Sequence, residues 1–227
     1  RLDKEEQYIA TLREMENTYD DSDALRNEVR WKIAKYHKDK GEILKAKYIA
    51  QQIIDSNDDS IFVENAKRLI NNILLPTLRA NVDKFVPTEH EIVFKTTHKN
   101  IDKVYFRIGK VSKNFFDKPD YLGNHYLDTL ARMMSDCKDY SFDVEKNPEH
   151  ASTTSELSLP PQPLGHYAVH ISDREDFDKG ETSYHLIRIT DLVAVNASIP
   201  HSNTIKVLDR KSGQPVENAI VKVTGSE

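Results

Sequence analysis

The spacing of apolar residues changes near Pro76, and this change limits the chain to a fold with helices first and strands after. Up to Leu75, apolar residues recur every three or four positions, which is the period of an amphipathic α-helix. After Pro76 they recur at every second position, the period of a β-strand with one buried face. We therefore expect an α+β, multidomain chain, and 227 residues are enough for two cores.

The helical part contains four apolar stripes separated by short turns. Helices would begin roughly every 19 residues, a spacing typical of stacked antiparallel helical hairpins. Gly41 suits the left-handed residue that ends a helix, and Pro76 stops the last one. The stripes are Tyr8, Leu12, Met15 and Tyr19; Leu25, Val29, Ile33 and Tyr36; Ile43, Ala46, Ala50 and Ile53; and Phe62, Ala66, Leu69, Ile70 and Ile73.

One pair of helices resembles a tetratricopeptide repeat. The resemblance rests on Ala34, His37, Gly41, Ala46 and Ile53, which reproduce the spacing of that repeat where two helices touch. Small side chains are needed there because the backbones approach closely. The closing proline of the repeat is absent. Such hairpins serve either as spacers or as peptide-binding grooves, and both alternatives stay open.

The second part contains strand candidates and two interruptions. A helical segment carrying Leu122, Tyr126, Leu130 and Met133 is expected first, and a loop of about 20 residues is expected at 144–164. The Ser, Thr, Glu and Pro content of this loop predicts that it is mobile or laid across the surface. The strand candidates are 91–95, 103–111, 165–172 and 183–196, followed by a hairpin within 204–223 whose turn is 209–215.

Charge and hydropathy exclude several classes of partner. The net charge is -5, and basic residues are interleaved with acidic ones, so there is no basic stripe for nucleic acid or anionic membranes. No run approaches the roughly 18 apolar residues needed to cross a bilayer, which predicts no direct membrane insertion of this segment.

No group of residues predicts covalent chemistry or a cofactor. Cys137 is the single cysteine, and we interpret it as a small, partly buried residue and not as a nucleophile. The sequence lacks a nucleophile elbow, a phosphate loop and a dinucleotide fingerprint. We therefore expect a non-enzymatic chain without catalytic or cofactor-binding residues.

Two groups of residues have donor atoms that metal ions use, but neither predicts a metal site. His166 and His170 are four residues apart, which in a strand separates them by about 13 Å. With His185 on a neighbouring strand a shared zinc ion is conceivable, but ordinary strand histidines are favoured. The acidic run at 173–180 offers oxygen ligands for calcium but lacks the twelve-residue loop with its final glutamate, so a solvated turn is favoured. No metal site is predicted.

Four stretches resemble the first macroglobulin-type domains of the bacterial alpha-2-macroglobulin family. The resemblance covers roughly residues 81–227, and its last motif is shared with other immunoglobulin-like β-domains. It implies a macroglobulin-like, immunoglobulin-like antiparallel β-sandwich after the helices. The stretches are 99–111 (KNIDKVYFRIGKV), 159–169 (LPPQPLGHYAV), 190–195 (TDLVAV) and 209–219 (DRKSGQPVENA).

The helical period before Pro76 and the resemblance after it together predict three domains, and the resemblance implies a role. We expect a helical hairpin module at 1–78, a macroglobulin-like sandwich with a helical insertion at 79–198, and the start of a second β-domain at 199–227. The family traps proteases through a bait region, and many members carry a thioester within Cys-x-Glu-Gln. Cys137 is followed by Lys-Asp-Tyr, so no functional residue of the family is carried over.

The expected function is therefore that of a scaffold in a large endopeptidase inhibitor of the periplasm or cell envelope. Proteases would be bound through parts of the parent protein outside this fragment, as would any lipid anchor. The alternative is a surface binding or adhesion protein, in which the helical repeats bind a partner and the β-domains are spacers.

Overall fold

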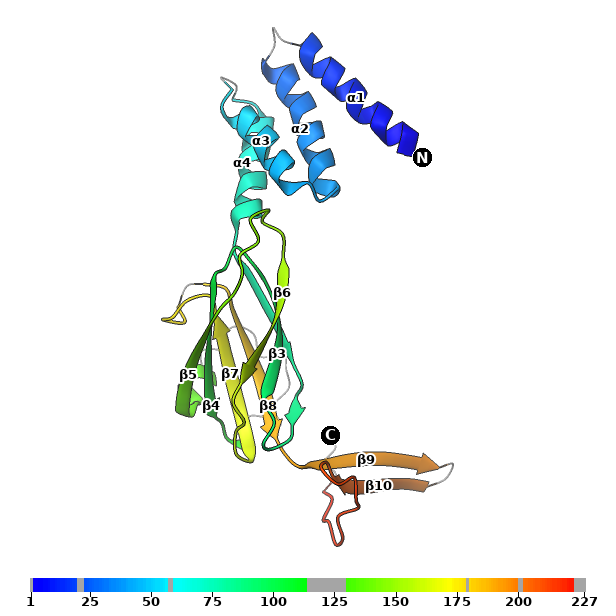
Figure 1. The fold of residues 1–227 in the computed structure, drawn as a ribbon, viewed down its shortest axis with the longest axis vertical. Coiled ribbons are helices and arrows are strands. Elements are labelled where there is room, and N and C mark those ends of the chain that lie inside the picture. Colours follow the sequence, from blue (N-terminus) through cyan, green and yellow to red (C-terminus); the bar gives the residue numbers. More distant parts are fainter. Residues whose placement is uncertain are drawn as a thin grey trace, which may run out of the picture. The chain divides into compact units, whose positions relative to one another are not determined.

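The structure is a computed structural model, and it describes residues 2–19, 23–56, 59–113, 130–178, 180–199 and 202–222. The chain is an α+β protein whose helices precede its strands, as the apolar spacing predicts (Figure 1). Within the described ranges, no helix combines the length and the apolar character needed to cross a membrane.

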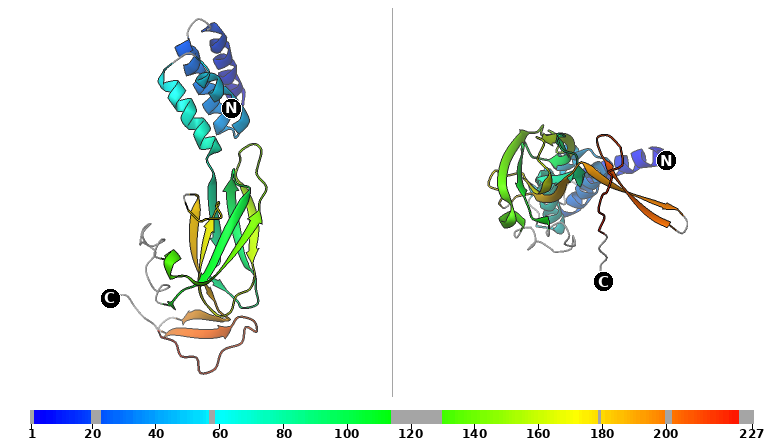
Figure 2. Two further views of the ribbon diagram at one scale, coloured as in Figure 1. Left: turned by 90° about the vertical axis from the view of Figure 1, so that its left-hand side faces the viewer. Right: turned by 90° about the horizontal axis from the view of Figure 1, so that it is seen from below.

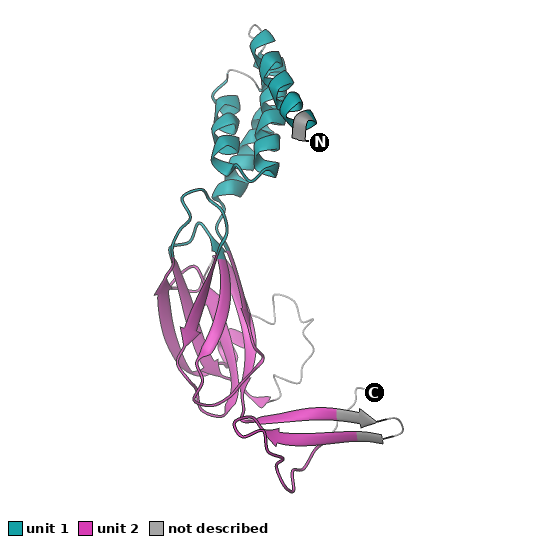
Figure 3. Cartoon of the chain, turned by 45° about the vertical axis from the view of Figure 1, so that its right-hand side comes forward, with its two compact units in different colours: residues 1–77, 98–102, 145–153 teal, residues 78–97, 103–144, 154–227 magenta. Residues whose placement is uncertain are grey.

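The structure divides the chain into two compact units (Figure 3). Unit 1 contains residues 1–77 together with two short loops, 98–102 and 145–153. Unit 2 contains residues 78–97, 103–144 and 154–227. This division into two units does not test the three domains predicted from the sequence, which remain a prediction.

Unit 1 is built on four helices, each of which contacts the next along the chain. Most residues of their apolar stripes pack in two clusters, one around Leu12, Val29 and Ile33 and the other around Ala50, Ile53 and residues of the last helix. The prediction is wrong for Tyr8 and Leu25, which are exposed. Gly41 has φ +77°, so the predicted left-handed residue lies where one helix gives way to the next. The helices are α1 (Leu2–Thr18), α2 (Asp23–Asp39), α3 (Ile43–Ile54) and α4 (Ile61–Leu74).

Unit 2 is a β-sandwich with an additional two-stranded ribbon (Figures 1 and 2). One sheet has the order β1-β3-β6, the other β2-β8-β7-β4-β5, and the ribbon pairs β9 with β10. The strands are β1 (Thr77–Val82), β2 (Phe85–Val86), β3 (Ile92–Lys99), β4 (Lys103–Lys110), β5 (Ser135–Asp143), β6 (Thr153–Leu159), β7 (Gly165–Ser172), β8 (Thr182–Ile189), β9 (Leu192–Ile199) and β10 (Ser202–Asp209).

The core of the sandwich lies where the two sheets meet. Phe94 of β3 and Phe106 of β4 are fully buried, and their rings meet edge to face with centroids 5.1 Å apart. Val104, Phe106 and Ile108 share one buried face, as the alternation in this strand predicts. These aromatic contacts tie the sheets together and account for the sandwich.

The predicted loop at 144–164 is wrong, because residues 153–159 form strand β6 next to β3. Leu157 and Leu159 are buried, and the hydroxyl oxygens of Thr154 and Thr97 lie 3.1 Å apart across the two strands. Only two apolar residues mark this edge strand, so its composition is that of a loop.

The predicted strand at 183–196 is also wrong, because it is two strands, β8 and β9. The chain turns at Thr190 and Asp191, where the carboxylate of Asp191 accepts hydrogen bonds from the backbone N–H and the hydroxyl of Thr88. The continuous apolar run contains neither Gly nor Pro and therefore conceals this turn.

The final predicted hairpin is partly wrong. The turn at 209–215 forms, with Gly213 at φ +70° and the carboxylate of Asp209 accepting from the N–H of Ser212 at 2.8 Å. However, β10 pairs with β9, and a single bridge between Leu208 and Pro215 follows among the described residues. Asn218, with φ +58°, then turns the chain away.

The predicted helical interruption lies largely outside the described residues, which exclude 114–129 and therefore Leu122 and Tyr126. Residues 130–133 are helical. Leu130 is buried in a cluster with Val111 and Ala168. This cluster covers the face of β7 that points away from the other sheet.

Candidate binding groove in the helical unit

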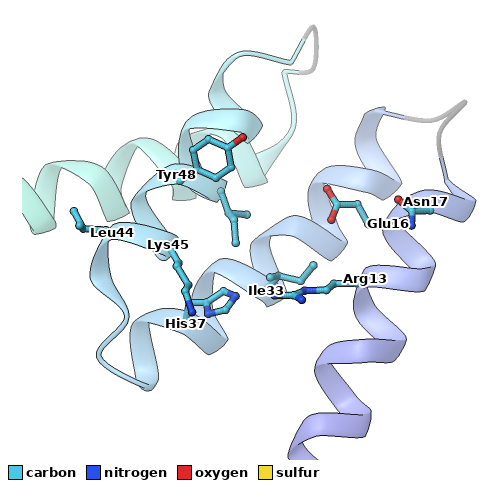
Figure 4. Close-up of a pocket in the computed structure, with 9 residues that line it drawn as sticks. Arg13, Glu16, Asn17, Ile33, His37, Leu44, Lys45 and Tyr48 are labelled. Carbon is cyan, nitrogen blue, oxygen red and sulfur yellow. The ribbon is translucent and has the colours of Figure 1, made fainter. Parts of the chain in front are cut away.

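A groove with a volume of about 600 Å³ lies on the helices of unit 1 (Figure 4). Its walls come from α1 and α3, and its floor from α2. The lining residues are Arg13, Glu16, Asn17, Ile33, His37, Leu44, Lys45, Tyr48 and Ile49.

Small residues bring the helices close enough to define this groove. Ala34 of α2 and Ala46 and Ala50 of α3 are completely buried, so the backbones of these helices approach without long side chains between them. The side of α3 that does not pack against α2 carries larger residues. Leu44 is 47% exposed and Tyr48 66% exposed, so the groove offers apolar surface to solvent.

Charges at the groove are neutralised within the helical unit, with one exception. Glu16 is paired with Arg30 at 2.6 Å, and Lys45 with Glu42 at 2.9 Å. His37 also contacts Glu42, and the hydrogen bond from Lys45, followed by that from His37, lowers the pKa of the Glu42 carboxyl. Arg13 is exposed and makes no hydrogen bond or ion pair among the described residues. The groove therefore combines apolar surface with one unpaired cation, which suits an apolar and acidic segment.

The sequence did not indicate Arg13, Lys45 or Tyr48 as binding residues. A signal was present in α3, where Leu44 and Tyr48 fall outside the buried stripe of Ala46, Ala50 and Ile53. Apolar residues on the exposed side of an amphipathic helix are candidates for partner contact.

The structure does not bring the three strand histidines together. His166 and His170 lie on one face of β7, the face that carries Ala168, whereas His185 of β8 is opposite Val169 and faces the other way. Within the described ranges, no group of three or more His, Cys, Asp or Glu is placed to hold a metal ion.

His170 is instead part of an aromatic stack on the sheet. The centroid of its ring lies 3.9 Å from the ring centroid of Tyr184 and 4.8 Å from that of Phe177. The guanidinium of Arg107 lies over Phe177 at 4.4 Å and is hydrogen-bonded to Asp139 at 2.7 and 2.8 Å. Burial, followed by the charge of Arg107, lowers the pKa of His170 to about 4. The stack therefore holds the 173–178 segment on the sheet with a neutral histidine.

The other two rejected candidates lie in ordinary surroundings. Cys137 is an exposed residue of β5, and partial burial of its thiol raises its pKa, which disfavours the reactive thiolate. The described residues of the acidic run, 173–178 and 180, lie between β7 and β8, and the carboxylate of Asp176 accepts a hydrogen bond from the backbone N–H of Asp178 at 3.0 Å.

No protein-family model matches the sequence, and no curated protein sequence matches it. Among solved structures, the chain is similar to a fragment of native alpha-2-macroglobulin from Escherichia coli spanning domains NIE-MG1. The TM-score is 0.42 and the identity 15%, over 63% of this chain and 74% of that fragment.

A longer fragment of the same E. coli protein, spanning MG0-NIE-MG1, gives a TM-score of 0.45 and 15% identity over 63% of this chain and 48% of that one, so this chain spans about half of it. The CARDB domain of a Pyrococcus furiosus protein gives 0.28 and 9%, over 51% of this chain and 87% of that domain. At these values the similarities describe part of the chain and assign it to no family.

Proposed function

We propose that this chain is a non-catalytic scaffold segment of a larger alpha-2-macroglobulin-like endopeptidase inhibitor. The observation that supports this proposal is the placement of the four motif stretches. The first contains β4 and the second leads into β7, and these strands are neighbours with Ile108 opposite Val169. The third leads into β9 and the fourth follows β10, with Leu192 opposite Asp209. The motifs thus form two pairs in space.

The proposed role is to hold parts of the parent protein in place while the protease is captured elsewhere. A buried sandwich core with edge-to-face aromatic rings suits such a role, because a close-packed core transmits force without repacking. The proposal places the parent protein in the periplasm or cell envelope, with protease contact and any lipid anchor outside this segment.

We expect the isolated chain not to inhibit proteases, whereas the complete natural protein does. Several unrelated endopeptidases, each with a large protein substrate, are mixed with equimolar chain or with equimolar complete protein. A direct inhibitor of a protease needs a rigid exposed loop that fits the active-site cleft of the protease. Stoichiometric inhibition by the chain alone, or no inhibition by the complete protein, contradicts the proposal.

A second function is favoured by the groove of the helical unit. We propose that it binds an extended peptide segment of a partner protein, in which an apolar side chain packs on Leu44 and Tyr48. A neighbouring carboxylate then pairs with Arg13. The unpaired guanidinium and the exposed apolar surface together support this choice of ligand.

The groove is tested with a blocked peptide of alternating leucine and glutamate, titrated into isotope-labelled chain. We expect shifts confined to the amides of the lining residues, and a loss of affinity of about tenfold or more in Arg13→Glu, because a charge-assisted contact is lost. Lys35→Glu is the matched control, since Lys35 is an exposed cation of α2 that does not line the groove. Equal losses in both variants, or no binding, would contradict the assignment.

A further inference from the structure

A continuous chain of polar contacts crosses unit 1 and joins its two loops to its helices. The Nζ of Lys47, on α3, lies 3.1 Å from Nε2 of His150, in the 145–153 loop. The Nδ1 of His150 lies 2.7 Å from Oδ1 of Asn100, in the 98–102 loop. The Nδ2 of Asn100 donates to the backbone carbonyl oxygens of Ile73 at 2.7 Å and Leu75 at 3.3 Å.

The order of donors and acceptors fixes the protonation state of the His150 ring. Since the amide nitrogen of Asn100 donates to α4, its oxygen is the atom that faces His150 and can only accept. Nδ1 of His150 must therefore carry the hydrogen. An ammonium group has no lone pair, so Lys47 donates to Nε2, which must be unprotonated. The chain of contacts is complete only when the imidazole is neutral.

Both loop residues are held in an uncommon backbone conformation. Asn100 has φ +56° and His150 φ +57°, in the left-handed region that residues other than glycine seldom adopt. The unfavourable geometry persists where surrounding contacts maintain it. The hydrogen bonds of these two side chains supply such contacts.

We propose that His150 is a pH-sensitive latch, which holds the 145–153 loop on α3 when neutral and releases it when it gains a proton. A proton on Nε2 removes the acceptor for Lys47 and places two cations about 3 Å apart. The 145–153 loop then loses the contact that joins it to α3, whereas Nδ1 of His150 still donates to Asn100 and Asn100 still donates to α4.

The charged groups around His150 all lower the pKa of its ring. Burial, followed by the charges of Lys47 on α3, Lys146 on its own loop and Lys99 on the other loop, lowers its pKa from the ordinary value of 6.5. A lowered pKa means that the released state binds the proton more readily than the latched state. The stability from latching is therefore complete above about pH 6.5, and it falls as the pH drops toward the lowered pKa.

The test measures amide hydrogen exchange of both loops between pH 8 and pH 5 on the whole chain, as protection factors that correct for intrinsic exchange. We expect protection in the 145–153 loop to fall with pH, by at most about tenfold per pH unit, and protection in the 98–102 loop to change less. His150→Gln should abolish this dependence, because the glutamine amide can accept from Lys47 and donate to Asn100 but does not titrate. His90→Gln, at an exposed histidine of unit 2, should retain it.

Two further readouts separate the latch from other histidines. His98 also lies in unit 1, and burial lowers its pKa. A ring titration by NMR should give His150 a pKa below 6.5 that rises in Lys47→Met. Loop protection that is equal at pH 8 and pH 5 would overturn the proposal. So would a pH dependence that persists unchanged in His150→Gln, which would assign the effect to another titratable group of unit 1.

Discussion

Phe106→Ala is expected to lower the free energy of unfolding of unit 2 by about 3–5 kcal/mol, because it leaves a cavity in a core that cannot collapse around it. Phe106 is fully buried, and its ring meets Phe94 at 5.1 Å and Phe142 at 5.4 Å. The substitution removes both edge-to-face contacts as well as the buried apolar area.

Hydrogen exchange of the amides in β4 and β7 measures this loss directly. Phe85→Ala is the matched control, since Phe85 is a 41% exposed phenylalanine of the same unit, and its loss should stay below about 1 kcal/mol. Fluorescence of Trp31, the single tryptophan, which packs on the helical core, should report an unchanged unit 1. Similar losses in both variants would show that Phe106 does not anchor the sandwich core.

Ala46→Leu is expected to lower the free energy of unfolding of unit 1 by about 3 kcal/mol. Ala46 is completely buried where α3 meets α2, so three added carbon atoms must displace backbone or force side chains out of their rotamers. Unfolding in urea, followed by Trp31 fluorescence, measures the change.

Ala10→Leu provides the comparison, because Ala10 lies on the exposed side of α1. Alanine and leucine have similar helix propensities, so the exchange itself changes little. We expect this control to change stability by less than about 0.5 kcal/mol. If both substitutions were tolerated alike, the close approach of α2 and α3 would not depend on small residues, and the resemblance to a tetratricopeptide repeat would lose its physical basis.

The helices could be predicted because a long amphipathic segment repeats its signal over several turns. At least two predicted apolar positions of each helix pack in its cluster, and Gly41 marks a boundary with a backbone conformation that it adopts readily. Strands β4 and β7 were equally clear, since their inner faces carry an unbroken set of apolar residues such as Val104 and Ile171.

The errors occurred where local composition gave no information about pairing. Strand β6 is polar apart from Leu157 and Leu159, and it is a strand because β3 provides hydrogen-bonding partners. The turn at Asp191 depends on Thr88, which is about a hundred residues away in sequence. A contact of this kind leaves no periodic signal.

The groove and the His150 latch could not be predicted for a related reason. Each depends on residues from several elements, and their juxtaposition arises only in the folded chain. Nothing in the sequence around His150 indicates that its ring faces Lys47, which is 103 positions earlier. Strand alternation places His166 and His170 on one face, whereas the opposite orientation of His185 depends on the register between β7 and β8.

Unit 1 is discontinuous in sequence, and this has a consequence for the order in which the chain can fold during synthesis. The four helices leave the ribosome before the strands, but the carbonyl groups of Ile73 and Leu75 receive Asn100 only after 25 or more further residues have been made. His150 follows later still. The helices can therefore reach their final hydrogen bonding only when residues on both sides of β4 have been synthesised, and a gene fragment that ends at residue 77 encodes a helical unit without those bonds.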